Sequence, residues 1–233
     1  MAEFDKNALL AAIEHIPSLA PLISSLNAIA PDDPAAGQKL DELLADKPDL
    51  LAKTLKVYNA IHYSYPDPIA SMFEASTIIG FPMARNVLIV TAFIDSFREP
   101  PRLRFDRTHF WKHCIAVAHA AKEFAEAETS FSPEEIRDIY LAALFHDFGI
   151  VILEGFFPEM CQQVLDAVKT GQSFYEAERN TLGEWQHPVI GRIVAEQWGL
   201  PPIVVETAAW HHQPDRVEDP KIAHCVYLIH LAH

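Results

Sequence analysis

Apolar residues recur at three- and four-residue steps along almost the whole 233-residue chain, and no segment alternates convincingly between apolar and polar residues. This spacing is typical of helices that bury one face and expose the other. Polar or proline-containing segments, such as residues 31–34 (PDDP) and 62–68 (HYSYPDP), separate the periodic stretches. The sequence therefore predicts an all-α protein.

The apolar periodicity, together with the residues that start and end helices, gives the range of each predicted helix. Ser132 should cap one helix, with Glu135 completing a capping box, and Gly149 should end that helix after Phe148. A long helix should begin at Asp106 or Thr108. Its predicted buried face comprises Phe110, His113, Val117, Ala120 or Ala121, and Phe124. The predicted ranges are 5–15, a run to about 29, 35–46, 48–60, 69–79, a helix ending near 97, 108–127, 133–148, 158–170, 173–182, 188–198, 201–212 and 221–233.

The segment 98–107 (REPPRLRFDR) is the clearest boundary, because it contains two prolines and four arginines. We expect two packed helical lobes: an N-terminal lobe over 1–97, an Arg/Pro-rich linker over 98–107 and a second lobe over 108–233. The linker arginines are Arg98, Arg102, Arg104 and Arg107. They either pair with acidic neighbours such as Asp106 on a solvated linker or face the second lobe and hold an anion.

Charge and composition restrict the partners and the compartment. The formal net charge is −14, of which −10 falls in residues 109–233, so we expect no nucleic-acid binding. The best apolar run, 78–97, is interrupted by Pro82, Arg85 and Asp95, which predicts no membrane span. Three widely spaced cysteines fit neither a disulfide framework nor a zinc motif, and the N-terminus is acidic. We therefore expect a cytoplasmic protein.

Ten of the twelve histidines lie in residues 109–233, and several occupy positions where an imidazole is unexpected. His113 lies on the apolar face of its helix, and His146 and Asp147 interrupt the apolar run LAALFHDFGIVIL. Buried imidazoles and carboxylates are costly unless they are partnered. The other candidates flank prolines or helix ends: His187, His211, His212 and His233.

Neutral imidazoles and an ionised carboxylate are ligands for Zn, Fe, Mn or Ni, and a bridging Asp suits two ions. Two such ions can clamp a phosphate. Each histidine alone could instead be a hydrogen-bonded core residue, and His211 and His212 could reach two metals or one metal and a substrate. We predict surface or packing roles for His15, His62, His109, His119 and His224.

The order of these pieces resembles the HD superfamily of metal-dependent phosphohydrolases, and the whole chain from about residue 16 resembles the HDOD domain, a relative of the HD-GYP cyclic-dinucleotide phosphodiesterases. The first lobe contains KPDLLAKTLKVYNA and PDPIASMFEASTIIGF. The second contains FWKHCIAVAHAAKEFA, LAALFHDFGIVIL, EWQHPVIGRIVAEQWGLPPIVVETAAWHH and AHCVYLIHLAH. The resemblance implies that His113, His146, Asp147, His187, His211 and His212 stand at the family's metal-ligand positions.

The sequence also departs from the phosphodiesterase pattern. Ile150 stands where those relatives have a Lys, QPDR (213–216) replaces their GYP segment, and His233 stands in place of a final Asp. Few cations lie near the motifs; Lys112 and Arg192 are the candidates for holding an anion.

The resemblance implies a bacterial signal-transduction module that acts through a protein partner or through self-association, with one or two divalent transition metals retained in the HD-like helical bundle. The alternative is an active phosphohydrolase, in which Asp147 would be the catalytic bridging ligand and a metal-bound water would attack a phosphodiester or a nucleotide. A third hypothesis is a scaffold whose histidines only donate hydrogen bonds to backbone carbonyls.

Overall fold

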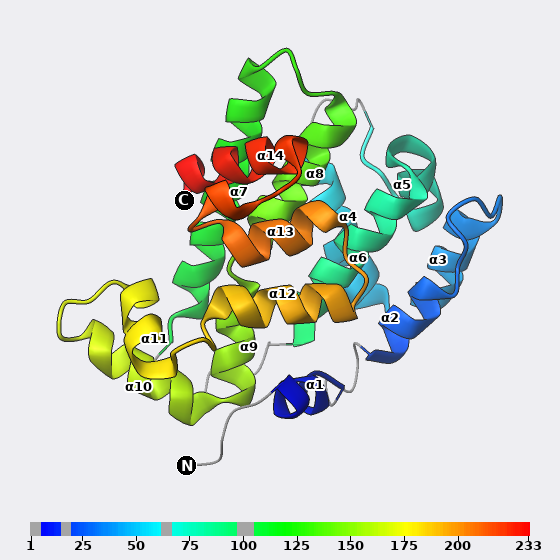
Figure 1. Cartoon of the computed structure of the whole chain (residues 1–233). Coiled ribbons are helices and arrows are strands. Elements are labelled where there is room, and N and C mark those ends of the chain that lie inside the picture. Colours follow the sequence, from blue (N-terminus) through cyan, green and yellow to red (C-terminus); the bar gives the residue numbers. More distant parts are fainter. Residues whose placement is uncertain (1–5, 15–19, 62–66, 97–104) are drawn as a thin grey trace. The chain divides into compact units, whose positions relative to one another are not determined.

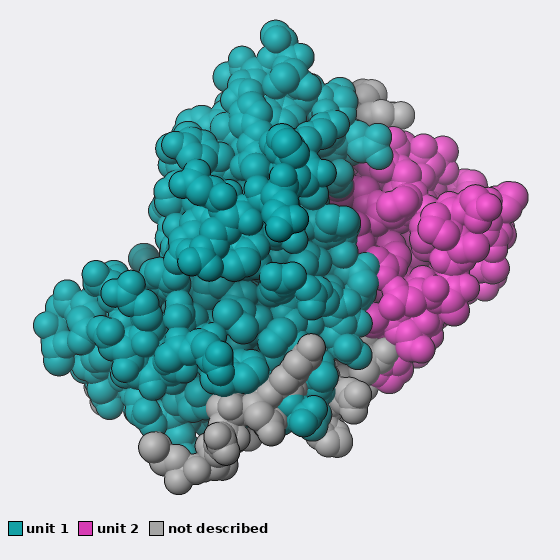
Figure 2. Space-filling view, viewed as in Figure 1, with its two compact units in different colours: residues 1–12, 100–233 teal, residues 13–99 magenta. Residues whose placement is uncertain are grey.

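A computed structural model describes residues 6–14, 20–61, 67–96 and 105–233, and every regular element within these ranges is helical (Figure 1). This confirms the predicted all-α class. The chain divides into two compact units, residues 13–99 and residues 1–12 with 100–233 (Figure 2). Arg98, Arg102 and Arg104 of the predicted linker, and His15 and His62, lie outside the described residues.

The first helix of the chain is α1 (Lys6–Glu14). The 13–99 unit contains α2 (Ala20–Asn27), α3 (Ala36–Leu44), α4 (Pro48–Ile61), α5 (Met72–Ile79) and α6 (Phe81–Ser96). Helix α6 is buried along most of its length and packs against α4 and α5. The hydroxyl of Tyr58, buried in α4, donates a hydrogen bond to the carbonyl of Ala84 in α6, which ties these two helices together.

The larger unit is built from α7 onward. Its elements are α7 (Arg107–Ala127), α8 (Pro133–Leu144), α9 (Phe148–Phe156), α10 (Pro158–Val168), α11 (Phe174–Leu182), α12 (His187–Gln197), α13 (Pro202–Trp210), the 3₁₀ helix η1 (Pro214–Arg216) and α14 (Pro220–Ala232). Helix α13 packs against α8, α12 and α14, and α7 packs against α8 and α14. This arrangement brings the ends of distant helices to one place.

The helix starts follow the predicted capping chemistry. The Ser132 hydroxyl accepts from the backbone N–H of Glu135, and the Glu135 carboxylate accepts from the N–H of Ser132, so the capping box is confirmed. Asp106 caps α7 by accepting from the N–H of His109 at 2.9 Å.

The buried face of α7 differs in part from the prediction. Phe110, Val117 and Ala121 are buried as expected, but the Phe124 residue is 42% exposed and Ala125 is fully buried in its place. With 3.6 residues per turn, the residue four positions after Ala121, Ala125, continues the buried face near the end of the helix. Phe124 therefore points outward.

The prediction of one helix over 133–148 that ends at Gly149 was wrong. Helix α8 stops at Leu144, residues 145–147 form a turn, and Gly149 lies inside the new helix α9. A Cβ added at Gly149 would lie 2.1 Å from the backbone oxygen of His187. The glycine therefore permits the close approach of α9 and α12 and is not a helix terminator.

The best apolar run differs from the predicted 78–97. It lies within Pro133–Phe156, where an 18-residue window has a mean hydropathy of 1.6 and meets the length and composition of a membrane span. In the folded molecule 89% of that window is buried.

Candidate metal centre

Seven ligand-type side chains meet where five segments of the larger unit come together. His113 lies on α7, and His146 and Asp147 form the turn between α8 and α9. His187 is the first residue of α12. The remaining three follow helix ends: His211 and His212 come directly after α13, and His233 directly after α14. All seven residues predicted as ligands therefore lie in one cluster, and Asp147 is shared by its two halves.

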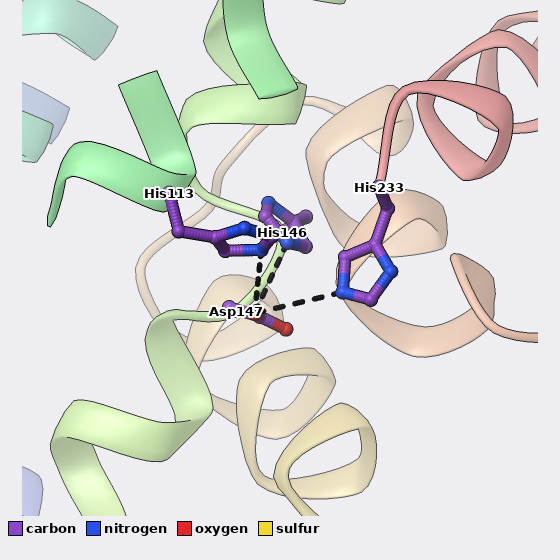
Figure 3. Close-up of side chains that lie close together, drawn as sticks. All are labelled: His113, His146, Asp147 and His233. Carbon is purple, nitrogen blue, oxygen red and sulfur yellow. Dashed lines mark ion pairs between the residues drawn. The ribbon is translucent and has the colours of Figure 1, made fainter. Parts of the chain in front are cut away.

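The first half surrounds Oδ2 of Asp147 (Figure 3). The Nε2 atom of His146 lies 3.1 Å from this oxygen, that of His113 3.5 Å and that of His233 3.9 Å. In Figure 3 the three rings converge on the carboxylate from separate elements. This half offers three imidazole nitrogens and one carboxylate oxygen, all within 4.8 Å of one another.

The second half surrounds Oδ1 of the same carboxylate. The Nε2 atoms of His187 and His211 each lie 3.2 Å from Oδ1, and they lie 3.3 Å from each other. The Nε2 atom of His212 lies 3.3 Å from that of His187. The second half therefore offers the same donor set as the first, three imidazole nitrogens and one carboxylate oxygen. Both adjacent histidines belong to this one group.

These separations fit a coordinated cation. Two ligand atoms that are each about 2.0–2.1 Å from a tetrahedral ion lie roughly 3.3 Å apart, which matches the nitrogen–nitrogen spacings of the second half. Two buried atoms in the centre, Nε2 of His146 and Oδ1 of Asp147, make no hydrogen bond. Buried polar atoms without a partner are uncommon in proteins, and a metal ion would satisfy both. The residues present therefore fit one or two divalent transition-metal ions.

The outer nitrogens of three rings are held so that the inner nitrogens face the centre. The Nδ1 atom of His146 lies 2.7 Å from the Ala143 carbonyl, and that of His211 lies 2.9 Å from the Thr207 carbonyl. The Nδ1 atom of His187 contacts the Glu178 carboxylate. A ring that donates its Nδ1 proton outward presents the Nε2 lone pair inward, as a metal ligand requires.

The electrostatics follow from burial and from the shared carboxylate. Burial alone would raise the pKa of Asp147, but the surrounding imidazoles, His146 foremost, hold that pKa well below its ordinary value. Burial lowers the pKa of His211 and of His233 to about 4 each, and burial together with neighbouring histidines lowers that of His212 to about 2. These three rings are therefore neutral near pH 7, as ligands must be.

His187 is the exception. Burial would lower its pKa, but the carboxylates of Glu178 and Asp147 outweigh burial and raise the pKa to about 10. An imidazolium between two carboxylates offsets one of their two negative charges when no ion is bound. An ion at Nε2 would replace the proton on that nitrogen. The ring would keep its Nδ1 proton and donate it to Glu178.

A cavity of about 300 Å³ opens onto the first half of the centre. Ile150, which the resemblance set against a Lys of the phosphodiesterase pattern, lies on its wall. The described lining contains no Lys or Arg and consists of Phe105, Asp106, His109, Phe110, His113, Asp147 and Ile150. A small ligand could thus reach Asp147, but the described walls carry no Lys or Arg that could hold a phosphate group.

The other predicted site residues lie away from the cluster. Lys112 is exposed on α7, and Arg192 forms an ion pair with Glu196 on the exposed side of α12 at 2.9 Å. Neither lines the cavity, and anion binding by them stays a prediction. Arg107 pairs with the buried carboxylate of Glu154.

Three histidines expected to have surface or packing roles are described. His119 packs edge-on against Tyr140, and His224 pairs with Glu128 at 3.2 Å. His109 differs because it lines the cavity.

Sequence reasoning missed the contribution of α11. Glu178, fully buried, accepts from both the backbone N–H and the ring of His187, and Tyr175 stacks on His212 with ring centroids 4.3 Å apart. The segment FYEAERNTL is the most polar of the helices and predicts an exposed surface. Its one available signal is the capping box from Ser173 to Glu176, which marks the helix start but not its contacts.

A family model for the HDOD domain matches residues 16–214, so the chain belongs to the HDOD domain family. The fold agrees with that of an HDOD domain protein of unknown function from Geobacter sulfurreducens, with a TM-score of 0.67 and 26% identity over 97% of this chain and 76% of that one. It also agrees with a Shewanella amazonensis protein called "Putative phosphohydrolase", with a TM-score of 0.69 and 21% identity over 97% and 80%.

Among curated proteins, an uncharacterised protein of Treponema pallidum is 23% identical over 178 residues, which are 73% of this chain. The chain spans about a third of the length of that relative, 32%.

Proposed function

We propose that this HDOD chain is a signal-transduction module whose larger unit holds two divalent transition-metal ions around Asp147. One observation carries the proposal: the two oxygens of a single buried carboxylate face two groups of three imidazoles each. Nε2 of His146 and Oδ1 of Asp147 are buried and make no hydrogen bond, which costs about 1–3 kcal/mol for each group, and a bound ion would remove that cost.

Regulation is favoured over turnover by what surrounds the centre. Phosphoryl transfer needs cations around the phosphate as well as metal ions. The described cavity wall has Ile150 at the position of the relatives' Lys and carries Asp106 nearby. The module would act in the bacterial cytoplasm and pass its signal to a protein partner or to a second copy of itself.

A phosphohydrolase is the second candidate, and the cavity beside Asp147 and His113 favours it. When bound, a divalent ion lowers the pKa of a coordinated water and polarises a phosphoryl oxygen. The residues of this chain would hold the ions through the seven ligands, and the apolar walls formed by Phe105, Phe110 and Ile150 would limit the access of bulk water.

The test is metal content measured by mass spectrometry on purified chain after loading with Zn²⁺, Fe²⁺, Mn²⁺ or Ni²⁺ and removal of free ions. We expect two ions per wild-type chain and none in Asp147→Asn, which keeps the side-chain shape but removes the shared charge. His119→Ala is the matched control, because His119 is an exposed histidine on the same helix as His113. Wild-type protein without bound metal would refute the metal centre.

The same loaded samples separate the two candidates. Each is assayed with bis(p-nitrophenyl) phosphate and with cyclic dinucleotides. A regulatory module retains its ions and shows no turnover above the Asp147→Asn background. Turnover that His119→Ala retains and Asp147→Asn abolishes would replace the regulatory proposal with the phosphohydrolase.

A further inference from the structure

We infer that Glu178 is a positioning residue that orients a ligand of the second half of the metal centre and does not act on the first half. This inference rests on the proposed metal centre and extends it to a residue outside the ligand set. Glu178 lies on α11, nine residues before His187, and its side chain is fully buried. Burying an ionised carboxylate is unfavourable unless its oxygens have partners, and both oxygens of Glu178 bind one residue.

The contacts show how the carboxylate holds its partner. One oxygen, Oε1, accepts from the backbone N–H of His187 at 3.1 Å, and the other, Oε2, contacts Nδ1 of the same ring. His187 is the first residue of α12, where the backbone N–H has no partner within the helix. Glu178 therefore fixes both the start of α12 and the rotation of the ring.

Two other ligands of the centre are held differently. His146 and His211 direct Nδ1 to backbone carbonyls three and four residues earlier in the chain, which are local contacts. His187 has no such local carbonyl partner and depends on a side chain from another helix. Its ring then points Nε2 at Oδ1 of Asp147 and at the rings of His211 and His212. Loss of Glu178 should therefore affect the second half and spare His113, His146 and His233.

A carboxylate that accepts the outer proton of a ligating imidazole also makes that imidazole a stronger donor. Removing such a partner commonly lowers metal affinity about 10–100-fold. We expect this loss for one of the two ions and none for the other. Tyr175, stacked on His212, comes from the same helix, so α11 supports two of the three imidazoles of the second half.

The test is titration with Co²⁺, followed by its visible absorption and by the number of ions bound, on wild type, Glu178→Ala and Glu178→Gln. We expect wild type to bind two ions tightly. Glu178→Ala should bind one tightly and the other about 10–100-fold more weakly. Glu178→Gln should recover part of the loss, because an amide oxygen still accepts one of the two hydrogen bonds and leaves no cavity. Glu184→Ala, an exposed change between α11 and α12, is the control.

A double-mutant cycle distinguishes positioning from a general loss of stability. Adding Glu178→Ala to His187→Ala should cause no further loss of the weaker ion, because the ring that Glu178 positions is already gone. Adding His233→Ala should instead weaken the remaining ion. Equal weakening of both ions in Glu178→Gln, or wild-type binding of both ions in Glu178→Ala, would overturn the inference alone. A wild-type chain that binds no Co²⁺ would overturn the metal centre and the inference together.

Discussion

The donor atoms of the cluster set the kind of ion that it can hold. Each half combines three imidazole nitrogens with one oxygen of Asp147. Nitrogen-rich sites of this type suit Zn, Fe or Ni, whereas Mg and Ca prefer oxygen ligands. His233 takes part in this bias because it supplies the third imidazole of its half. The centre therefore carries a single formal negative charge among its seven ligands.

Gly149 gives the sharpest prediction at the scale of single residues. Gly149→Ala would place a methyl group 2.1 Å from the carbonyl oxygen of His187, and neither backbone can move without shifting a ligand. Overpacking of this kind costs about 1–3 kcal/mol. We expect a lower free energy of unfolding in urea together with weaker metal binding.

Gly191→Ala is the graded comparison for Gly149→Ala. Its Cβ would meet side-chain atoms of Ala208 and Phe148 at 3.3 Å, which can yield by a few tenths of an ångström. It should destabilise less and leave the metal affinity close to wild type. Equal losses in both variants would show that the contact with His187 has no special importance.

The members of the cluster were predictable because imidazoles and a carboxylate in apolar segments are unusual and need a partner when they are buried. Glu178 was not predictable by the same reasoning. It lies in a polar helix, and its burial depends on how α11 meets the start of α12. Tyr175 is similar, since a tyrosine near a helix start gives no sign of the ring that it will stack on.

At the scale of elements, the helices with explicit start signals were predicted within a few residues. Ser132 before Pro133 and Asp106 before Arg107 both cap the helices that follow. The break between α8 and α9 was missed because the apolar pattern continues through it. Glycine there suggested a helix end, whereas its lack of a side chain serves contact with α12. Local sequence cannot distinguish these two uses of glycine.

Helix α8 gives a prediction about pH. Burial, with a smaller contribution from Glu134, raises the pKa of Asp138 to about 6. The folded state thus binds this proton more tightly than the unfolded state, and the associated stability is present at low pH and lost as the pH rises from about 4 to about 6.

Asp138→Asn should remove that part of the pH dependence and raise the free energy of unfolding at pH 7 by about 1 kcal/mol, after allowance for partial solvent screening. The check is urea unfolding at several pH values, with the exposed Glu123→Gln as the control. A variant that is no more stable than wild type at pH 7 would contradict the prediction.

At the scale of the whole molecule, all seven ligands belong to the larger unit, and none comes from residues 13–99. A ligand that binds only the folded state stabilises it by about 2.7 kcal/mol at a concentration 100 times its dissociation constant. We expect Zn²⁺ to slow amide hydrogen exchange in α7–α9 and α12–α14 and to leave α3–α6 unchanged.

Exchange measured by mass spectrometry, with Asp147→Asn as the matched control, tests this expectation. Equal slowing of exchange in α3–α6 would mean that the response to metal is not confined to the larger unit. Slowing that persists in Asp147→Asn would place the responsible ion elsewhere.

The seven candidate ligands are distributed over α7, the α8–α9 turn, the start of α12 and the residues that follow α13 and α14. In the proposed centre, an intact coordination shell requires every one of these segments to be docked at once. Any event that detaches one of them, including the binding of another macromolecule, must weaken the hold on the ion. By thermodynamic reciprocity, the ion must oppose that event with the same free energy. Ion occupancy and the docking of the segments are therefore thermodynamically coupled, and a change in either one changes the other.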